Sequence, residues 1–560
     1  MFIRYNMQII KTFLVASIFI LPISLVAQST LFQQGSKENI LLDRLEIKMQ
    51  KDSLLNFSFL KPYSRKWWFS ALDRASDSSK NYRLSKVDRY NLSRSRLNNI
   101  EWDKQFKVGL DSQRRVLQSI YKRPANLISV WEKDFFISVN PVLQLQAMKD
   151  DATNELRYMN TRGVVIRSLL ADKIGFQAYV TETQEKPPVF LLEKIEQFRA
   201  VPGAGLYKRF KQTGYDYFDA RGSVYFNATR FLDIQFGYDK IFLGNGYRSL
   251  FMSDYASSHL FFNLNLHAGR FNYVSRVMEL TSQYTRRIDK DTLFPKKYAV
   301  IHHVSFNAPK WLTLGLFESI VFGRKNHVEF SYLNPVMFLR PAELQVGSPD
   351  NSFVGFDAKA NIGKRVQLYG QILIDEFFTK YIRQKNGWWG NKWAFQGGLK
   401  YIDVAGIKNL DLQLESNWIR PFTYSHFDTV GNYTHYNQPM AHPLMSNIRE
   451  YIAILRLQPA PKWTLQAKAI YWQSGVDTAG KNYGNNIFLS NETRAAFDGF
   501  FFGSPESRTN LNLNLWLAYE LKENLFLESN VYYRKIGEGP KNLFSSFGLR
   551  WNMQRREYDY

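Results

Sequence analysis

Runs of about ten residues in which apolar and polar side chains alternate recur from about residue 135 onward, and this pattern constrains the fold most strongly. In the segment 259–268, Phe262, Leu264 and Leu266 fall on one face, whereas Asn263 and Asn265 fall on the other. The segments LDIQFGY, NLDLQLESNW and NLNLNLWLAYE alternate in the same way. Because successive side chains of a strand point to opposite faces, the pattern predicts two-faced strands, and about ten residues is the length of a tilted membrane strand.

The alternating segments and their connections predict an even number of strands. We predict eighteen, with starts near residues 135, 157, 173, 215, 231, 259, 271, 298, 312, 353, 366, 393, 409, 448, 463, 508, 525 and 543. Short turns alternate with long loops, the latter at about 184–214, 240–258, 324–352, 419–447 and 474–507. Outer-membrane barrels have short periplasmic turns and long external loops. An even count would leave the N-terminal segment and Tyr560 on the same, periplasmic, side.

A membrane barrel also explains why the sheet must close. Hydrocarbon offers no hydrogen bonds to free backbone groups, so a sheet that crosses a bilayer can have no open edge. Aromatic residues make up 16% of the chain, as aromatic girdles at both membrane interfaces require, and Trp311 and Trp463 follow short turns at the interface level. A β-sandwich shows the same alternation, but its strands are usually nearer to about five or six residues.

Residues before the strands differ in pattern. Arg4 and Lys11 precede the apolar run 13–26, and Ala27 follows it, so residues 1–27 are predicted to be a secretory signal peptide. No other run approaches the roughly 18 apolar residues of a spanning helix. Residues 28–130 are predicted to be a helical periplasmic segment, and residues 131–560 the barrel. The triplet Leu-Asp-Arg occurs at 42–44 and 72–74, where it forms either ion pairs or solvated helix faces.

Composition excludes several functional classes. The chain has no cysteine, which excludes disulfides, thiolate metal sites and a cysteine nucleophile. No catalytic serine elbow, zinc-protease motif or phosphate loop is present, and the adjacent His302 and His303 point to opposite strand faces, so we expect no enzyme, no metal and no cofactor. The net charge of +23 is typical of nucleic-acid binding, but in an exported chain it favours anionic lipid headgroups or acidic polymers, and we expect no nucleic acid.

Two predicted external loops concentrate unusual residues. In GNGYRSLFMSD and in the loop 322–357, the candidate ligand contacts are Tyr247, Arg248, Asp254, Arg340, Glu343, Asp350 and Asn351. The alternative is that these charges form ion pairs that hold the loops in the barrel. The run YLNPVMFLRPAEL is too apolar for water, so we predict that this loop folds inward and narrows the lumen, with Arg340 and Glu343 as a buried pair.

A tryptophan cluster is the best candidate for sugar stacking. NGWWGNKW places Trp388, Trp389 and Trp393 close together, and an exposed indole offers a flat apolar face beside polar groups. The alternative is membership of an aromatic girdle at the membrane interface.

Three segments carry a resemblance to a known family. LLDRLEIK, FLGNGYRSLFMSD and SYLNPVMFLRPAELQVGSPDNSFVGFD resemble the Wzi-type capsule assembly proteins, in the branch that includes gliding-motility proteins of the RemB type. The resemblance spans most of the chain after residue 27. It implies an eighteen-stranded outer-membrane barrel with a helical periplasmic segment, a lumen closed by inward loops, and binding of surface polysaccharide.

The sequence therefore predicts an outer-membrane β-barrel that binds or organises surface polysaccharide, in capsule attachment or in gliding motility. Its expected partners are the polysaccharide, outer-membrane lipid and other envelope proteins that contact the N-terminal segment. An outer-membrane porin or substrate-specific channel is the alternative.

Overall fold

The computed structural model describes most of the chain. The described residues are 30–33, 35–77, 82–103, 125–132, 134–171, 173–211, 213–284, 293–336, 338–347, 350–478 and 480–560. The predicted signal peptide, 1–27, lies outside them. Within these ranges, no helix combines the length and apolar character needed to cross a bilayer.

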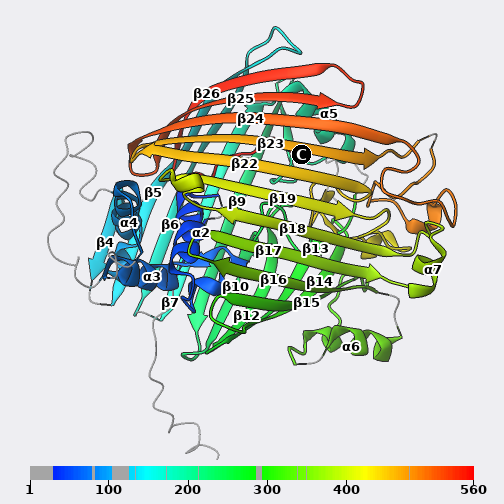
Figure 1. Ribbon diagram of the computed structural model, residues 1–560, viewed down its shortest axis with the longest axis horizontal. Coiled ribbons are helices and arrows are strands. Elements are labelled where there is room, and N and C mark those ends of the chain that lie inside the picture. Colours follow the sequence, from blue (N-terminus) through cyan, green and yellow to red (C-terminus); the bar gives the residue numbers. More distant parts are fainter. Residues whose placement is uncertain are drawn as a thin grey trace, which may run out of the picture.

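Eighteen antiparallel strands form one closed barrel (Figure 1). They are β5 (Phe135–Asp150), β6 (Arg157–Leu170), β7 (Ile174–Lys186), β9 (Gly214–Asn227), β10 (Leu232–Asp239), β12 (His259–Ala268), β13 (Phe271–Thr281), β14 (Lys296–Asn307), β15 (Leu312–Phe322), β16 (Asn351–Ile362), β17 (Val366–Glu376), β18 (Lys392–Tyr401), β19 (Leu410–Ile419), β22 (Ile448–Ala460), β23 (Trp463–Gly475), β24 (Ser507–Lys522), β25 (Leu525–Ile536) and β26 (Lys541–Trp551). β26 pairs with β5 and closes the sheet.

The predicted barrel is confirmed, strand by strand. The largest difference in a predicted start is two residues, as at β14, which was expected from 298 and begins at Lys296. Two short strands extend the sheet locally: β4 (Ile128–Glu132) pairs with β5, and β8 (Lys208–Phe210) pairs with β9. Because the sheet closes on itself, the β-sandwich alternative is wrong.

The two faces of the wall follow the alternation of the sequence. On β12, Phe262 is 42% exposed on the outside, whereas Asn263 is 3% exposed on the inside. Trp311 and Trp463, close to the short turns, are also exposed on the outer face. An apolar outer wall with aromatic residues near its edges is the surface that an outer-membrane barrel presents to lipid.

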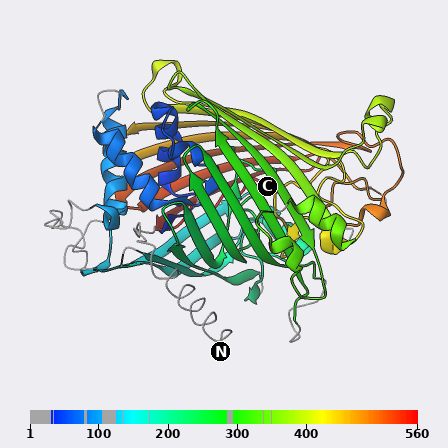
Figure 2. The ribbon, with the colours of Figure 1, turned by 90° about the horizontal axis from the view of Figure 1, so that it is seen from below.

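A helical bundle covers the barrel end that carries the short turns, which is the periplasmic end by that rule (Figures 1 and 2). Its elements are α2 (Lys37–Met49), α3 (Arg65–Asp77) and α4 (Lys86–Asn98), with η1 (Leu55–Phe57), η2 (Ile100–Trp102), β1 (Leu31–Phe32), β2 (Leu60–Lys61) and β3 (Tyr63–Ser64). Leu42, Leu45, Trp68 and Leu72 form its core. Ser85 and Asp88 begin α4 with a capping box, which satisfies two free backbone N–H groups.

Ion pairs attach this bundle to the barrel. Arg44 of α2, 5% exposed in its side chain, pairs with Asp88 of α4 and with Asp403 and Asp411 of the barrel. Burial alone would raise the pKa of Asp403, but the charge of Arg44 and a hydrogen bond from Lys48 lower it to about 2. The first Leu-Asp-Arg triplet is therefore an anchor. The second is more exposed: Arg74 pairs with Asp52 at 2.7 Å, with 41% of its side chain exposed.

The remaining elements lie in the connections between the barrel strands. They are α5 (Val189–Phe198), β11 (Phe242–Leu243), η4 (Phe330–Leu333), α6 (Leu339–Val346), α7 (Thr379–Gln384), η5 (Val404–Gly406), η6 (Thr429–Gly431), β20 (Thr434–His435), β21 (Gln438–Pro439) and η7 (Asn491–Thr493).

Long loops fill the lumen from the end opposite the helical bundle. β11, from the loop 240–258, pairs with β2 of the helical bundle. Phe251 of this loop and Met440 of the loop 420–447 are fully buried in the same apolar cluster. Segments from both ends of the barrel thus meet inside it.

The residues after β26 also enter the barrel. Tyr558 and Tyr560 are buried against Leu191 and Ile195 of α5. Figures 1 and 2 show the C-terminal end within the barrel outline. The expectation that Tyr560 lies on the periplasmic side is therefore wrong. The tail turns back into the lumen, where its tyrosines pack against the apolar side of α5.

The two Leu-Asp-Arg arginines offer a matched test of how the bundle is attached. Arg44→Met removes the ion-pair partner of Asp411 and leaves Asp88 and Asp403 with Lys48, and the loss of one member of a buried pair costs about 3–5 kcal/mol. We expect the free energy of local opening of α2, measured by hydrogen exchange, to fall by that amount. Arg74→Met removes an exposed pair and should cost about 0–1 kcal/mol. Equal protection of α2 in both variants would contradict the anchoring role of Arg44.

Candidate functional site

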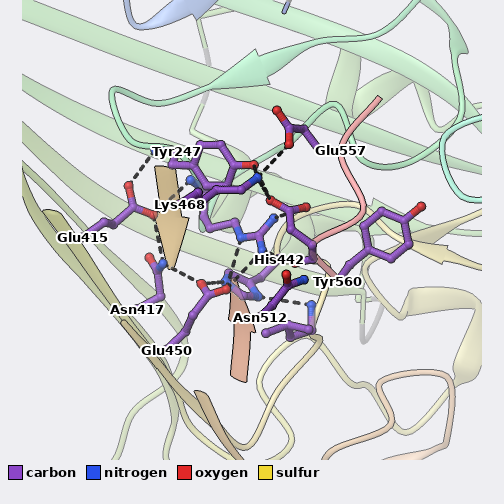
Figure 3. Close-up of polar contacts among 12 residues, drawn as sticks. Tyr247, Glu415, Asn417, His442, Glu450, Lys468, Asn512, Glu557 and Tyr560 are labelled. Carbon is purple, nitrogen blue, oxygen red and sulfur yellow. Dashed lines mark hydrogen bonds and ion pairs between the residues drawn. The ribbon is translucent and has the colours of Figure 1, made fainter. Parts of the chain in front are cut away.

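One carboxylate of the wall contacts the loop 240–258 at three consecutive residues. Glu415 of β19 accepts hydrogen bonds from the consecutive backbone N–H groups of Tyr247 and Arg248, at 2.6 and 3.0 Å (Figure 3). The hydroxyl of Tyr369 donates to the same carboxylate at 2.9 Å. Gly246 passes this point closely, since an added Cβ would lie 2.5 Å from a carboxylate oxygen of Glu415. Glu415 therefore fixes the position of the loop against the wall.

The guanidinium of Arg248 joins the wall to the C-terminal tail. It pairs with Glu450 of β22 at 3.1 Å and donates to the backbone oxygen of Asp559 at 2.6 Å. His442, from the loop 420–447, lies 2.8 Å from the second oxygen of Glu450. The side chain of Arg248 is 8% exposed and that of Glu450 is 0% exposed. Two loops, the wall and the tail thus share one buried charged centre.

Lys468 of β23 completes this network (Figure 3). Its ammonium group lies 2.8 Å from Asp559, 2.7 Å from Glu557 and 2.7 Å from the hydroxyl of Tyr247. That hydroxyl also donates to Asp559. A cation with three oxygen acceptors satisfies its three N–H groups, which is what a buried ammonium requires. In this geometry, Tyr247 and Arg248 join the loop 240–258 to the barrel wall and to the C-terminal tail.

A cavity of about 390 Å³ lies beside the network. Arg248, Asp254, Tyr255, Arg555 and Arg556 are among its lining residues. Asp254 does not join the network: its backbone oxygen accepts a hydrogen bond from Lys240 at 3.1 Å.

The described residues between β15 and β16 run along the outside of the barrel, so the prediction that the loop 322–357 folds inward is wrong (Figures 1 and 2). Arg340 and Glu343 do pair, at 2.6 Å, but the Arg340 side chain is 59% exposed. Asp350 pairs with Arg324 at 2.6 Å, and the Asn351 amide donates to the backbone oxygen of Gly431 at 2.9 Å. The apolar residues of this loop cover the outer wall, because other segments already fill the lumen.

Trp388 and Trp389 lie at the barrel end that carries the long loops, in a surface we term the external platform, residues 377–391 and 494–502. Trp388 stacks on Tyr381 of α7 at 4.1 Å, and Trp389 lies beneath the guanidinium of Arg494 at 4.3 Å. Both indoles are half-buried. Both indoles therefore pack against other side chains of the platform, and part of each ring is open to solvent.

Backbone hydrogen bonds join the two halves of the external platform. Trp389 N–H donates to Phe497 at 3.1 Å, and Phe500 N–H donates to Gly387 at 2.8 Å. Arg420 donates to the backbone oxygens of Asn391, Trp388 and Phe500, at 2.9 to 3.2 Å. Gly387 has a φ of 71°, and an added Cβ would lie 2.9 Å from the backbone nitrogen of Phe500. The loops are thus held in one conformation.

The exposed surface of the platform is aromatic and basic. Phe378, Phe497 and Phe501 are 50%, 64% and 51% exposed. Lys380, Arg383 and Lys385 of α7 and its C-terminal end are exposed beside them. Flat apolar rings next to fixed cations suit a ligand that has both apolar faces and negative charge.

Trp393 belongs to a different surface. It faces outward on β18, 5.8 Å from the ring of Phe502, which in turn lies 6.2 Å from Trp418. Arg449 lies over Phe502 at 4.6 Å. This group is the outer aromatic girdle, so the structure separates Trp393 from Trp388 and Trp389.

Several residues of the lumen network were not identified from the sequence. Glu415, Glu450 and Lys468 occupy the polar, lumen-facing positions of alternating strands, and this was the only signal available. His442 and Asp559 lie in segments without a periodic pattern. Among the described residues, no group of three or more His, Asp or Glu side chains is placed to hold a metal ion.

Comparisons with known proteins identify the fold. No family model matches the sequence, and no curated protein matches it. Among solved structures, the chain is similar to Wzi of Escherichia coli, an outer membrane protein involved in group 1 capsule assembly and a carbohydrate binding beta-barrel. The two sequences are 13% identical, the match covers 95% of this chain and 100% of Wzi, and the TM-score is 0.55. OprD from Pseudomonas aeruginosa is 13% identical over 75% of this chain and 95% of that one, with a TM-score of 0.40. The shared fold with Wzi, together with the apolar outer wall, identifies the chain as an outer-membrane β-barrel.

Proposed function

We propose that this barrel is not an enzyme and that it binds or organises surface polysaccharide through the external platform. The observation that carries the proposal is a rigid aromatic and basic surface on the long-loop end of a barrel whose lumen is filled. The predicted organisation, with a signal peptide at 1–27, a periplasmic segment at 28–130 and a barrel at 131–560, fits this proposal. It exposes the platform to the outside of the cell.

The chemistry of the platform supports a sugar polymer as ligand. Aromatic rings stack on the apolar C–H faces of sugar rings, and an aromatic residue buried by a ligand contributes about 1.5–3 kcal/mol. Arg383 and the neighbouring lysines can pair with carboxylate groups of an acidic polymer, with arginine favoured for bidentate contacts. Because backbone hydrogen bonds already fix the platform, binding costs little further ordering of the loops.

The cellular role that we propose follows from the ligand. Retention of polymer at the platform would serve capsule assembly or attachment, and Wzi, which has a similar fold, is a carbohydrate binding barrel involved in group 1 capsule assembly. The resemblance of three sequence segments to the gliding-motility branch extends the proposal to polymer used in surface movement. Exposed faces of α3 and α4 are where other envelope proteins would contact the periplasmic bundle.

Loss of the two platform indoles tests the proposal. We expect Trp388→Ala with Trp389→Ala to weaken binding of the organism's purified surface polysaccharide by about ten- to hundredfold, since each half-buried ring contributes only part of what a fully buried aromatic residue does. Binding is measured with the detergent-purified protein, and polymer retention is measured on cells. Arg383→Gln with Lys385→Gln, which leaves the packing intact, should weaken binding of acidic polymers at low salt and make the remaining binding less dependent on salt, because salt screens the charge pairs that are lost.

Trp393→Ala is the matched control, because it removes a tryptophan from the neighbouring girdle and not from the platform. It should leave polymer binding unchanged. Polymer retention that survives loss of Trp388 and Trp389, at normal barrel abundance, would remove the platform as the binding site.

A substrate-specific channel is the second candidate, and the cavity of about 390 Å³ in the lumen is the observation that favours it. We expect the protein to be almost non-conducting in planar bilayers, because the bundle, loops and tail meet inside the barrel. Arg248→Ala removes the charge that joins Glu450 to Asp559 and should produce brief open events. Arg340→Ala, on the outer wall, is the control. Steady conductance of the unmodified protein would favour the channel and contradict the closed lumen.

A further inference from the structure

The outer face of the barrel wall changes character along β14 and β15. Val304 and Leu316, near the middle of these strands, are 39% and 62% exposed, as lipid-facing residues are. Val300 and Ile320 lie on the same face, four residues further along each strand from the periplasmic end, and both are 0% exposed. Side chains that would otherwise contact lipid are therefore covered by protein at the outer end of the wall.

The cover is the outer-wall segment, residues 323–336 and 338–347. Tyr332 of η4 and Leu339 and Ala342 of α6 pack on the outward-facing Tyr298, Val300, Ile320 and Phe322, and all of them are buried. Figures 1 and 2 show α6 outside the wall, beside β14 and β15. An external loop thus turns back and lies along the outer end of the barrel wall.

Polar contacts attach the outer-wall segment to the strands. The N–H of Leu339 donates to Glu318 of β15 at 3.1 Å, and the hydroxyl of Tyr298 donates to the backbone oxygen of Asn326 at 2.9 Å. The hydroxyl of Tyr273 donates to the backbone oxygen of Pro335. Contacts with β13, β14 and β15 together hold the segment flat against the wall, so its outward side chains have a fixed direction.

Those outward side chains are apolar. Phe330, Val336, Phe338 and Leu344 are 82%, 88%, 73% and 69% exposed. Exposure of four such groups to water is unfavourable, and their burial in an apolar environment removes that cost. Charges on the segment nearly balance, with Arg324, Lys325 and Arg340 against Glu329 and Glu343, so headgroup attraction is not the dominant force. The surface requires an apolar environment.

We propose that the outer-wall segment is embedded in the outer leaflet and that Phe330, Val336, Phe338 and Leu344 contact the acyl chains of outer-membrane lipid. The lipid-facing belt of β14 and β15 continues directly into this surface, so one bilayer covers both. Arg340, 59% exposed in its side chain, extends from the same helix and can reach the polar headgroup layer. The segment broadens the barrel at the outer leaflet and restrains its rotation and tilt there.

The absence of cysteine makes the proposal directly testable, because a single introduced thiol can carry a spin label. Phe338→Cys and Leu344→Cys are labelled in the full chain and reconstituted into phospholipid vesicles. Collisions of the label with oxygen, which partitions into lipid, are compared with collisions with a water-soluble nickel chelate. Leu316→Cys is the control in the lipid belt, and Phe497→Cys is the control on the aqueous external platform.

We expect both labels on α6 to behave as the label at Leu316 does, with high oxygen contact and low nickel contact. High nickel contact, as at Phe497, would place the segment in water and overturn the proposal. Shielding from both reagents would also overturn it, since protein, such as a second copy, would then cover the surface. Val336→Cys repeats the measurement outside α6, and heat-modifiable migration on gels confirms that each barrel is folded.

Discussion

The absence of hydrogen-bonding partners in lipid is the constraint on which the rest of this structure depends. Each strand must satisfy its backbone groups through neighbouring strands, so β26 returns to β5 and the sheet closes. A closed sheet of eighteen strands encloses a wide lumen, and its inner face carries both polar side chains and apolar side chains that pack against the inward loops. That lumen is what the bundle, the inward loops and the tail occupy.

Buried charge is the second consequence of this arrangement. Arg44 joins α2 to the periplasmic turns, while Arg248 and Lys468 join the inward loop, the wall and the tail. Such pairs add little net stability, but removal of one member leaves uncompensated charge, so they specify a single arrangement of segments that enter from opposite ends. The rigid external platform rests on this filled interior, because its loops are continuous with strands that the network ties together.

The local rules of the sequence predicted much of the fold but only part of the site. Strand starts followed from alternation, as at β12 and β24, and the girdle position of Trp311 followed from its place after a short turn. The direction of the loop 322–357 did not follow. An apolar run such as YLNPVMFLRPAEL avoids water equally well inside a barrel or against its outer wall, and only the space left by other segments decides between them.

The sequence by itself determined the closed barrel, its strand number and the faces of its wall, because period-two alternation and loop length are local properties. Only the tertiary structure decided which loops enter the lumen, that the tail follows them, and that Trp393 faces lipid while Trp388 and Trp389 form a platform. These choices depend on competition for one enclosed volume and on pairing of charges such as Arg248 and Glu450, which lie 202 residues apart in the chain. No local pattern encodes a contact over that separation.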